Sequence, residues 1–181
     1  TIGPAVWAAC APVEGIGAGD WMVENGRLPP AAVLQIARQM AARLAELERL
    51  DIVHGDVGAA GLLLQPTGGV GLPAPGLRGL VRPQAGYGFD DLCPTAYDCL
   101  ARERIADGTP PTTASDIYAC GCLWWHLLAG RPPFAAGDAV GKIKAVHAAR
   151  WIDVRHLAAG VAEPLAGTIE WRLARAPAAR R

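Results

Sequence analysis

Residues 115–122 read SDIYACGC, and an apolar segment then leads to GRPPF at residues 130–134. The stretch from Asp116 to Leu128 is apolar nearly all round, a pattern typical of a buried helix. Ser115 is expected to cap the N-terminus of this helix, and Gly130 is expected to end it. A long buried helix is therefore the predicted centre of the fold.

The segment before residue 51 predicts a second long helix. Pro29 and Pro30 stand at its start, where the N–H that proline lacks is not needed. Apolar residues then recur at the three- and four-residue spacing of an amphipathic helix; they are Val33, Ile36, Ala37, Met40, Leu44 and Leu47. The helix is expected to run to about Leu50.

Three shorter helices are predicted around these two. The first covers residues 20–25, with Asp20 as its cap and Gly26 as its terminator. The others cover residues 138–148 and 164–174.

The rest of the chain predicts short strands and loops. Short apolar runs at residues 5–11, 52–53, 62–64 and 70–76 favour strands, since turn residues bound them. Residues 82–113 hold many prolines and glycines and are expected to form a long irregular loop, a kind of segment that is often functional. The predicted fold class is therefore mainly α with a few short β-strands.

Composition excludes several classes of protein. The 181 residues carry 17 basic and 17 acidic side chains, and 51% are hydrophobic. This fits one ordered domain and argues against a nucleic-acid binder, which needs a basic surface. The sequence has neither a long apolar run nor a signal peptide, so we expect a cytoplasmic protein without a membrane segment.

Five cysteines form no C-x-x-C pair, so no zinc site is predicted. They are Cys10, Cys93, Cys99, Cys120 and Cys122. We expect small buried thiols in a reducing compartment.

The order of several short motifs resembles a known family. His54-Gly55-Asp56 follows the long helix, Ala101-Arg102-Glu103 comes later, and SDIYACGC and GRPPF are the most specific pieces. Together they resemble the large, mostly helical lobe of the eukaryotic-type Ser/Thr protein kinases, in their bacterial form. The resemblance covers nearly all 181 residues. It implies that residues 1–15 are the last small-lobe strand and the hinge, that residues 16–181 are the large lobe, and that the small lobe is largely absent.

The chain departs from that family at the residues that carry the chemistry. The family's catalytic loop reads H-R-D-x-K-x-x-N, and His54 and Asp56 match it. The family's Arg, Lys, Asn and D-F-G Asp are replaced here by Gly55, Gly58, Gly61 and Ala74 respectively. The A-P-E motif keeps Glu103 but not its proline.

These replacements predict impaired phosphoryl transfer. Kinases accelerate that reaction mainly by positioning and by charge stabilisation from metals and cations. Gly61 and Ala74 offer no side-chain oxygen, so Mg²⁺ is not expected, whereas ATP stays possible. Asp56 keeps the position of the general base and is interpreted as vestigial, since base catalysis supplies only about 10²–10⁴-fold.

The resemblance also implies structural roles. It implies that Asp116 accepts hydrogen bonds from the loop backbone near His54, and that Glu103 pairs with Arg180. It places Leu63 beneath an adenine.

Four functions remain open at this point. The first is a pseudokinase that acts as a scaffold or regulator and binds a protein through residues 82–113 and the helix after Gly137. The second is an active kinase that transfers the ATP γ-phosphate to protein hydroxyls, with Asp56 as base and its metal held by other groups, for which the candidates are Asp90, Asp91 and Asp98. The third is nucleotide binding without transfer, with the backbone of residues 9–13 as hinge. The fourth is a fragment of a longer kinase.

Overall fold

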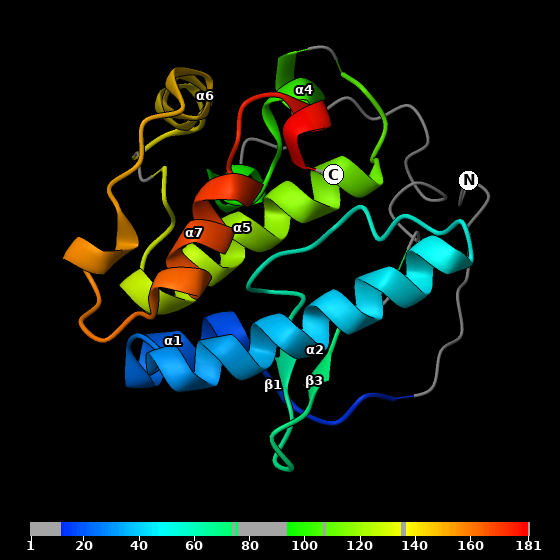
Figure 1. Ribbon diagram of the computed structural model, residues 1–181, viewed down its shortest axis with the longest axis vertical. Helices are drawn as coiled ribbons and strands as arrows, with labels where there is room; N and C mark the ends of the chain where they lie inside the picture. Colours follow the sequence, from blue (N-terminus) through cyan, green and yellow to red (C-terminus); the bar gives the residue numbers. More distant parts are fainter. Residues whose placement is uncertain (1–11, 74, 76–93, 107, 135–136, 181) are drawn as a thin grey trace, which may run out of the picture.

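The computed structural model describes residues 12–73, 75, 94–106, 108–134 and 137–180. Helix α5 (Thr113–Ala129) runs through the middle of the molecule and packs against α7 (Glu163–Arg172) and α2 (Pro30–Arg49) (Figure 1). Its side chains are buried nearly all round, and Trp124, Trp125 and Leu128 are among the largest fully buried ones. The prediction of a buried central helix is confirmed. The strand expected over residues 5–11 lies outside the described residues.

The start of α5 differs from the prediction by one turn. Thr112, not Ser115, is the N-cap, and its side chain accepts a hydrogen bond from the Ser115 N–H. The Ser115 hydroxyl accepts in return from the Thr112 N–H at 2.9 Å, which completes a capping box. The predicted terminator is confirmed, because Gly130 adopts the left-handed conformation with φ of 74°.

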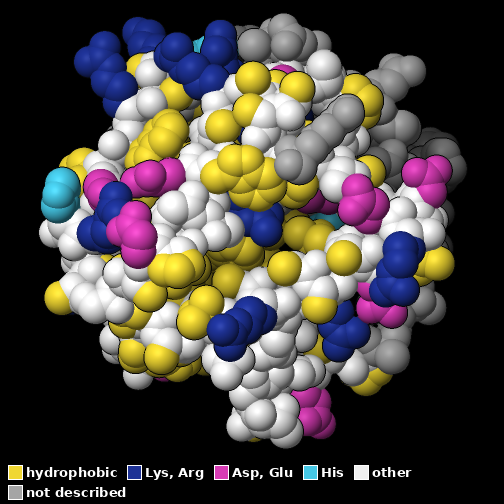
Figure 2. Space-filling model, in the orientation of Figure 1, with side chains coloured by type: hydrophobic (Ala, Val, Ile, Leu, Met, Phe, Trp, Pro, Cys, Tyr) yellow, Lys and Arg dark blue, Asp and Glu magenta, His cyan; other side chains and the backbone are white. Residues whose placement is uncertain are grey.

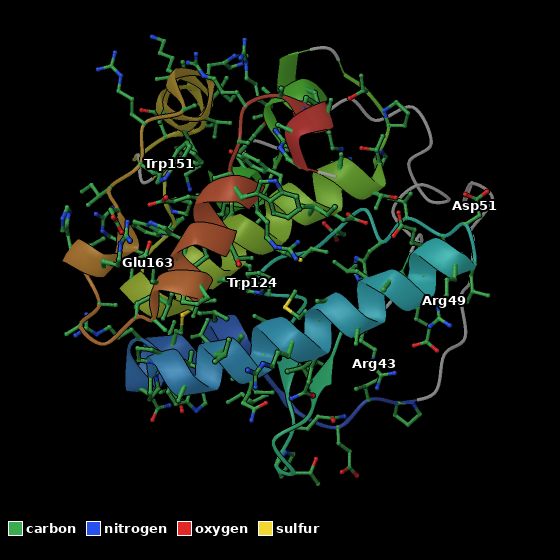
Figure 3. All side chains as sticks on the ribbon, viewed as in Figure 1. Arg43, Arg49, Asp51, Trp124, Trp151 and Glu163 are labelled. Carbon is green, nitrogen blue, oxygen red and sulfur yellow. The ribbon has the colours of Figure 1, made fainter. Side chains whose placement is uncertain are left out.

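Helix α2 has the predicted bounds, with Pro29 as its N-cap residue. Its stripe is buried at Val33, Ile36, Ala37 and Met40, and is partly exposed further along. The sulfur of Met40 accepts a hydrogen bond from the indole N–H of Trp124, which joins α2 to α5. Figure 3 shows Trp124 between these helices and α7.

Helix α1 (Ala18–Asn25) precedes α2 and starts two residues earlier than predicted. Its N-cap is Gly17, so the prediction of Asp20 as the cap is wrong. Asp20 lies inside the first turn, where an acidic residue suits the positive end of the helix. Gly26 ends the helix as predicted.

Three two-residue strands form a small antiparallel sheet in the order β1 (Ile16–Gly17), β2 (Leu63–Leu64) and β3 (Val70–Gly71). Leu63 pairs with Gly17 on one side and with Gly71 on the other. The strand predicted at residues 52–53 is absent from the described chain. The backbone there turns to the helix end, with the Ile52 N–H bonded to the Leu47 carbonyl.

Residues 82–113 are less irregular than predicted, within their described part. A 3₁₀ turn, η2 (Pro94–Tyr97), and a short helix, α4 (Arg102–Ala106), lie there. The N–H groups of Arg104 and Ile105 bond to the Ala101 carbonyl, and Ala101 packs into the core. Burial of this apolar side chain favours a helical turn over an open loop.

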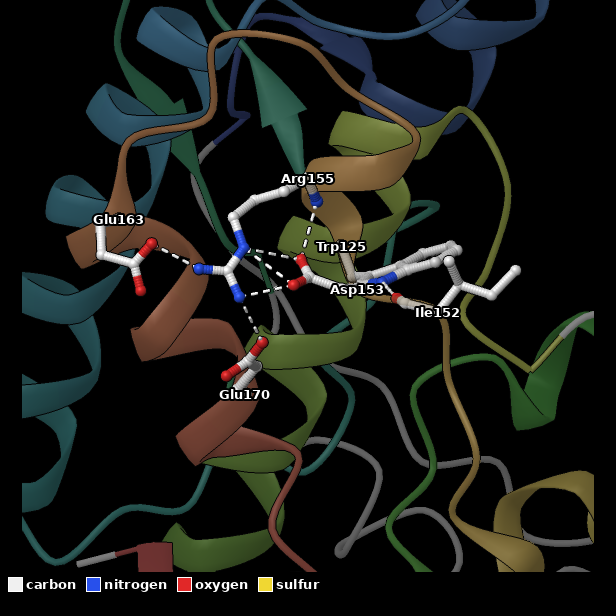
Figure 4. Close-up of polar contacts among 6 residues, drawn as sticks. All are labelled: Trp125, Ile152, Asp153, Arg155, Glu163 and Glu170. Carbon is white, nitrogen blue, oxygen red and sulfur yellow. Dashed lines mark hydrogen bonds and ion pairs between the residues drawn. The ribbon is translucent and has the colours of Figure 1, made fainter.

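The C-terminal third closes over α5. It comprises α6 (Ala139–Ala148), η3 (Val154–His156), α7 and η4 (Pro177–Arg180). Arg155 forms ion pairs with Asp153, Glu163 and Glu170, and so links η3 to α7 (Figure 4). Close by, the Trp125 indole N–H donates to the Ile152 carbonyl at 2.9 Å.

Three of the cysteines lie in the described part of the chain. All are free thiols; Cys120 and Cys122 are fully buried, as predicted, and Cys99 is partly exposed. Burial raises the pKa of Cys120 to about 12, so this thiol stays protonated at neutral pH. Among the described residues, no helix combines the length and the apolarity needed to cross a membrane.

Candidate functional site

A cavity of about 460 Å³ lies between the loop at residues 55–61, helices α1 and α5, and the segment at residues 95–104. Small and apolar residues form most of its wall. The ionisable side chains on the wall belong to Asp56, Asp98, Cys99, Arg104, Asp116 and His126.

The buried carboxylate of Asp116, near the start of α5, holds the backbone at the beginning of this loop. One oxygen accepts from the His54 N–H at 2.8 Å, and the other accepts from the Gly55 N–H at 2.9 Å. The structure thus brings Asp116 and the backbone near His54 together, across more than sixty residues of sequence. Burial raises the pKa of Asp116 to about 6, and the two N–H groups and Arg104 oppose that rise.

His54 points inward and Asp56 outward. The His54 side chain is 2% exposed, and its Nδ1 accepts from the Asp56 N–H at 3.3 Å. Burial lowers the pKa of His54, which keeps the imidazole neutral at pH 7. Asp56 is exposed and lies on the cavity wall, so its carboxylate is accessible to a molecule in the cavity.

Arg104 is a cavity residue that the sequence analysis missed. Its side chain is only 8% exposed, and its Nη1 donates to the Gly55 carbonyl at 3.0 Å. Arginine is usually a surface residue, and nothing in the pattern around Arg104 indicates burial. Arg104 on α4 therefore places a guanidinium beside Gly55, the loop position at which the family has an arginine.

Gly55 is required by the backbone at that position. Its φ is +79°, and an added Cβ would lie 3.0 Å from Pro111 Cγ. We expect Gly55→Ala to lower the free energy of unfolding by about 1–3 kcal/mol, because a left-handed non-glycine residue is strained. Gly58→Ala is the matched control, since its added Cβ meets nothing within 4 Å. Urea denaturation measures both, and equal stabilities would contradict this account.

The described residues of the cavity do not fit a magnesium ion. Gly58 and Gly61 offer no side chain, and Asp98 is paired with the buried Lys142. Within the described ranges, no three His, Cys, Asp or Glu residues are grouped as metal ligands. Ala74, Asp90 and Asp91 lie outside those ranges. At Gly61 an added Cβ would make ordinary contacts of 3.6 Å or more, so space does not require glycine there.

Glu103 and Arg180 meet behind the cavity. Arg180 is fully buried, and its Nη1 and Nη2 lie 2.7 and 3.3 Å from the two Glu103 carboxylate oxygens. The Arg180 guanidinium also donates to the Ala174 carbonyl and lies 4.6 Å from the Tyr118 ring centre. The pair ties α4 to the last turn of the chain.

Leu63 lies apart from this cavity. It is in the central strand of the small sheet and is partly exposed. A Cβ added to Gly15 would lie 3.2 Å from the Leu63 Cβ, so Leu63 borders the residue that precedes β1.

Comparisons with known proteins agree with this architecture. The family model for protein tyrosine and serine/threonine kinases matches residues 20–156, most of the chain. The chain therefore belongs to the protein kinase family, and its helical fold with a small sheet fits the large lobe of such a domain.

Its curated relatives include bacterial serine/threonine kinases. PkaA of Streptomyces coelicolor is 34% identical over 132 residues, 71% of this chain and 24% of that protein. PknL of Mycobacterium tuberculosis is 33% identical over 132 residues, 71% of this chain and 32% of that protein. PrkC of Bacillus subtilis is 29% identical over 128 residues, 71% of this chain and 19% of that protein. The chain thus spans a third or less of these relatives.

Proposed function

We propose that this chain is a protein-kinase large lobe that keeps the family's scaffold, does not transfer phosphate, and acts by binding a partner protein. The observation that carries the proposal is the composition of the loop at residues 56–61. Asp56 is its one ionisable residue, and the positions that match the family's Lys and Asn are Gly58 and Gly61.

Electrostatics supports the proposal. Transfer of a phosphoryl group needs cations and metal ions close to the developing charge. Asp56 could accept a proton from a hydroxyl, but that contribution is about 10²–10⁴-fold and does not replace the missing metal site. Arg104 donates to the Gly55 carbonyl through Nη1.

The retained contacts support a scaffold role. Asp116 holds the loop backbone, and Glu103 holds Arg180. Both are internal contacts that a protein-binding lobe needs for its shape. The surface proposed for the partner comprises the described part of residues 82–113 together with α6. Nucleotide binding without transfer is compatible with this role.

The test is phosphate transfer and thermal denaturation with the protein at its full natural length. We expect no incorporation of labelled γ-phosphate into the protein or into a generic substrate. We also expect the same melting temperature with ATP alone and with ATP plus Mg²⁺. A ligand at a hundred times its Kd adds about 2.7 kcal/mol, which moves the melting temperature by several degrees.

Asp56→Ala is the control, since Asp56 is exposed and is not part of the hydrophobic core. A melting shift that requires Mg²⁺, with phosphate incorporation that Asp56→Ala abolishes, would overturn the proposal. That result would establish an active kinase.

A further inference from the structure

A second, smaller groove lies between α2, α5 and α7, and Asp116 lines both it and the larger cavity. Its volume is about 140 Å³. Apolar side chains form most of the wall; they are Ala41, Leu44, Ala45, Ile52, Ile117 and Trp171. The face drawn in Figure 2 is hollowed between α7 and α2, where hydrophobic side chains surround a basic one.

Arg172 brings a positive charge to this groove. Its guanidinium carbon lies 4.5 Å from the ring centre of Trp124 and 5.6 Å from that of Trp171. The two indoles fix the guanidinium by cation–π contact. Such a site presents a preorganised planar fork of N–H donors to whatever enters the groove.

That cation has no counterion in the described part of the chain. No ion pair there includes Arg172, and its buried Nε has no hydrogen-bond partner. Burial lowers the pKa of Arg172, which reports the same unfavourable surroundings. Asp116 and Glu48 are the acids of the groove. The Asp116 carboxylate is directed to the His54 and Gly55 N–H groups, and no ion pair joins either acid to Arg172.

Two features of the groove define its occupant. Its volume suits one apolar group, since a cavity of about 150 Å³ holds a benzene-sized molecule. Its cation suits a carboxylate, because arginine pairs with carboxylates through two parallel hydrogen bonds. In addition, Trp171 is 40% exposed beside the groove, and exposed tryptophan is enriched in protein interfaces.

We propose that the groove between α2, α5 and α7 binds the C-terminal residue of a partner polypeptide, with an apolar side chain in the groove and the terminal carboxylate on Arg172. A C-terminal residue carries both groups on one Cα. The proposal does not depend on whether the chain transfers phosphate, because none of residues 54–61 lines the groove.

The test compares N-acetyl-L-leucine, which has the carboxylate, with N-acetyl-L-leucinamide, which lacks the charge. Binding is followed through the indole N–H signals of Trp124 and Trp171 in two-dimensional NMR, assigned with Trp→Phe variants. We expect the acid to bind about tenfold more tightly than the amide, as a charge-assisted hydrogen bond implies.

Variants make the test specific. Arg172→Gln is expected to remove the preference for the acid, whereas Arg175→Gln, an exposed arginine nearby in sequence, is expected to leave it unchanged. Ala41→Leu fills the groove and is expected to block both probes while Arg172 stays in place. Equal affinities for acid and amide, or no shift of either indole in the folded protein, would overturn the proposal. Tighter binding of octanoate than of N-acetyl-L-leucine would overturn the peptide assignment in favour of an acyl chain.

Discussion

Asp116→Ala is expected to lower the free energy of unfolding by about 2–6 kcal/mol, because it leaves two buried N–H groups without acceptors. Those donors belong to His54 and Gly55 and lie 2.8 and 2.9 Å from the carboxylate. Each unsatisfied buried donor costs about 1–3 kcal/mol. Urea denaturation at pH 7.5 measures the loss, since the pH is then above the raised Asp116 pKa of about 6.

Two further variants bracket this result. Asp116→Asn keeps one acceptor oxygen, so its free energy of unfolding is expected to lie between that of Asp116→Ala and that of the natural protein. Glu24→Ala changes an exposed acid on α1 and is expected to alter stability by less than about 0.5 kcal/mol. An Asp116→Ala protein as stable as the Glu24→Ala protein would show that the loop does not depend on this carboxylate.

The contribution of Asp116 to stability changes with pH in a defined direction. The folded-state pKa of Asp116 is raised, so the folded protein binds this proton more tightly than the unfolded chain does. The contribution of Asp116 is therefore largest below about pH 4 and declines as the pH rises to about 6. Asp116→Asn is expected to remove this decline from the stability profile, and an unchanged profile would contradict the assignment.

Breaking the buried pair from one side is the second large effect. Glu103→Ala leaves the fully buried Arg180 without its carboxylate, and we expect a loss of about 3–5 kcal/mol. Arg180→Met, which keeps an apolar stem, is the partner variant for a double-mutant cycle. Because the two residues are in contact, the cycle is expected to give a coupling energy of roughly 1–3 kcal/mol.

The control cycle uses the exposed pair Arg43–Glu46 on α2, in which the side chains are 64% and 55% exposed. Surface pairs of this kind contribute less than about 0.5 kcal/mol in a helix. Urea midpoints of all the variants supply both cycles. Equal coupling in the two cycles would mean that burial adds nothing to the Glu103–Arg180 contact.

Local patterns predicted the helices well and the contacts between distant segments poorly. The period of α2 and the apolar run of α5 are properties of neighbouring residues, so both helices were predicted close to their observed bounds. Ser and Thr both suit an N-cap, so residue type alone does not decide between Thr112 and Ser115. The choice depends on the residue at which the backbone becomes helical. Ile52 and Val53 favour a strand by residue type, but none of the described strands pairs with them.

In the site, too, local motifs were predicted from the sequence and contacts between distant segments were not. The motif at residues 54–56 is visible in the sequence, and the resemblance to kinases implies which acid lies beneath it. No local pattern indicates that Arg104 turns inward to the Gly55 carbonyl, since arginine is usually a surface residue. The position of Arg172 could not be predicted either, because its guanidinium contacts two tryptophans from different helices.

The contact between Glu103 and Arg180 also sets an order for folding during synthesis. The two residues are 77 positions apart, so α4 and α5 leave the ribosome well before Arg180 is added. Until then Glu103 has no cation and Tyr118 lacks the guanidinium that covers it. A nascent chain stalled before residue 180 should hold α2 against α5 yet leave α4 open to proteases. The lobe would then close once Arg180 has left the ribosome.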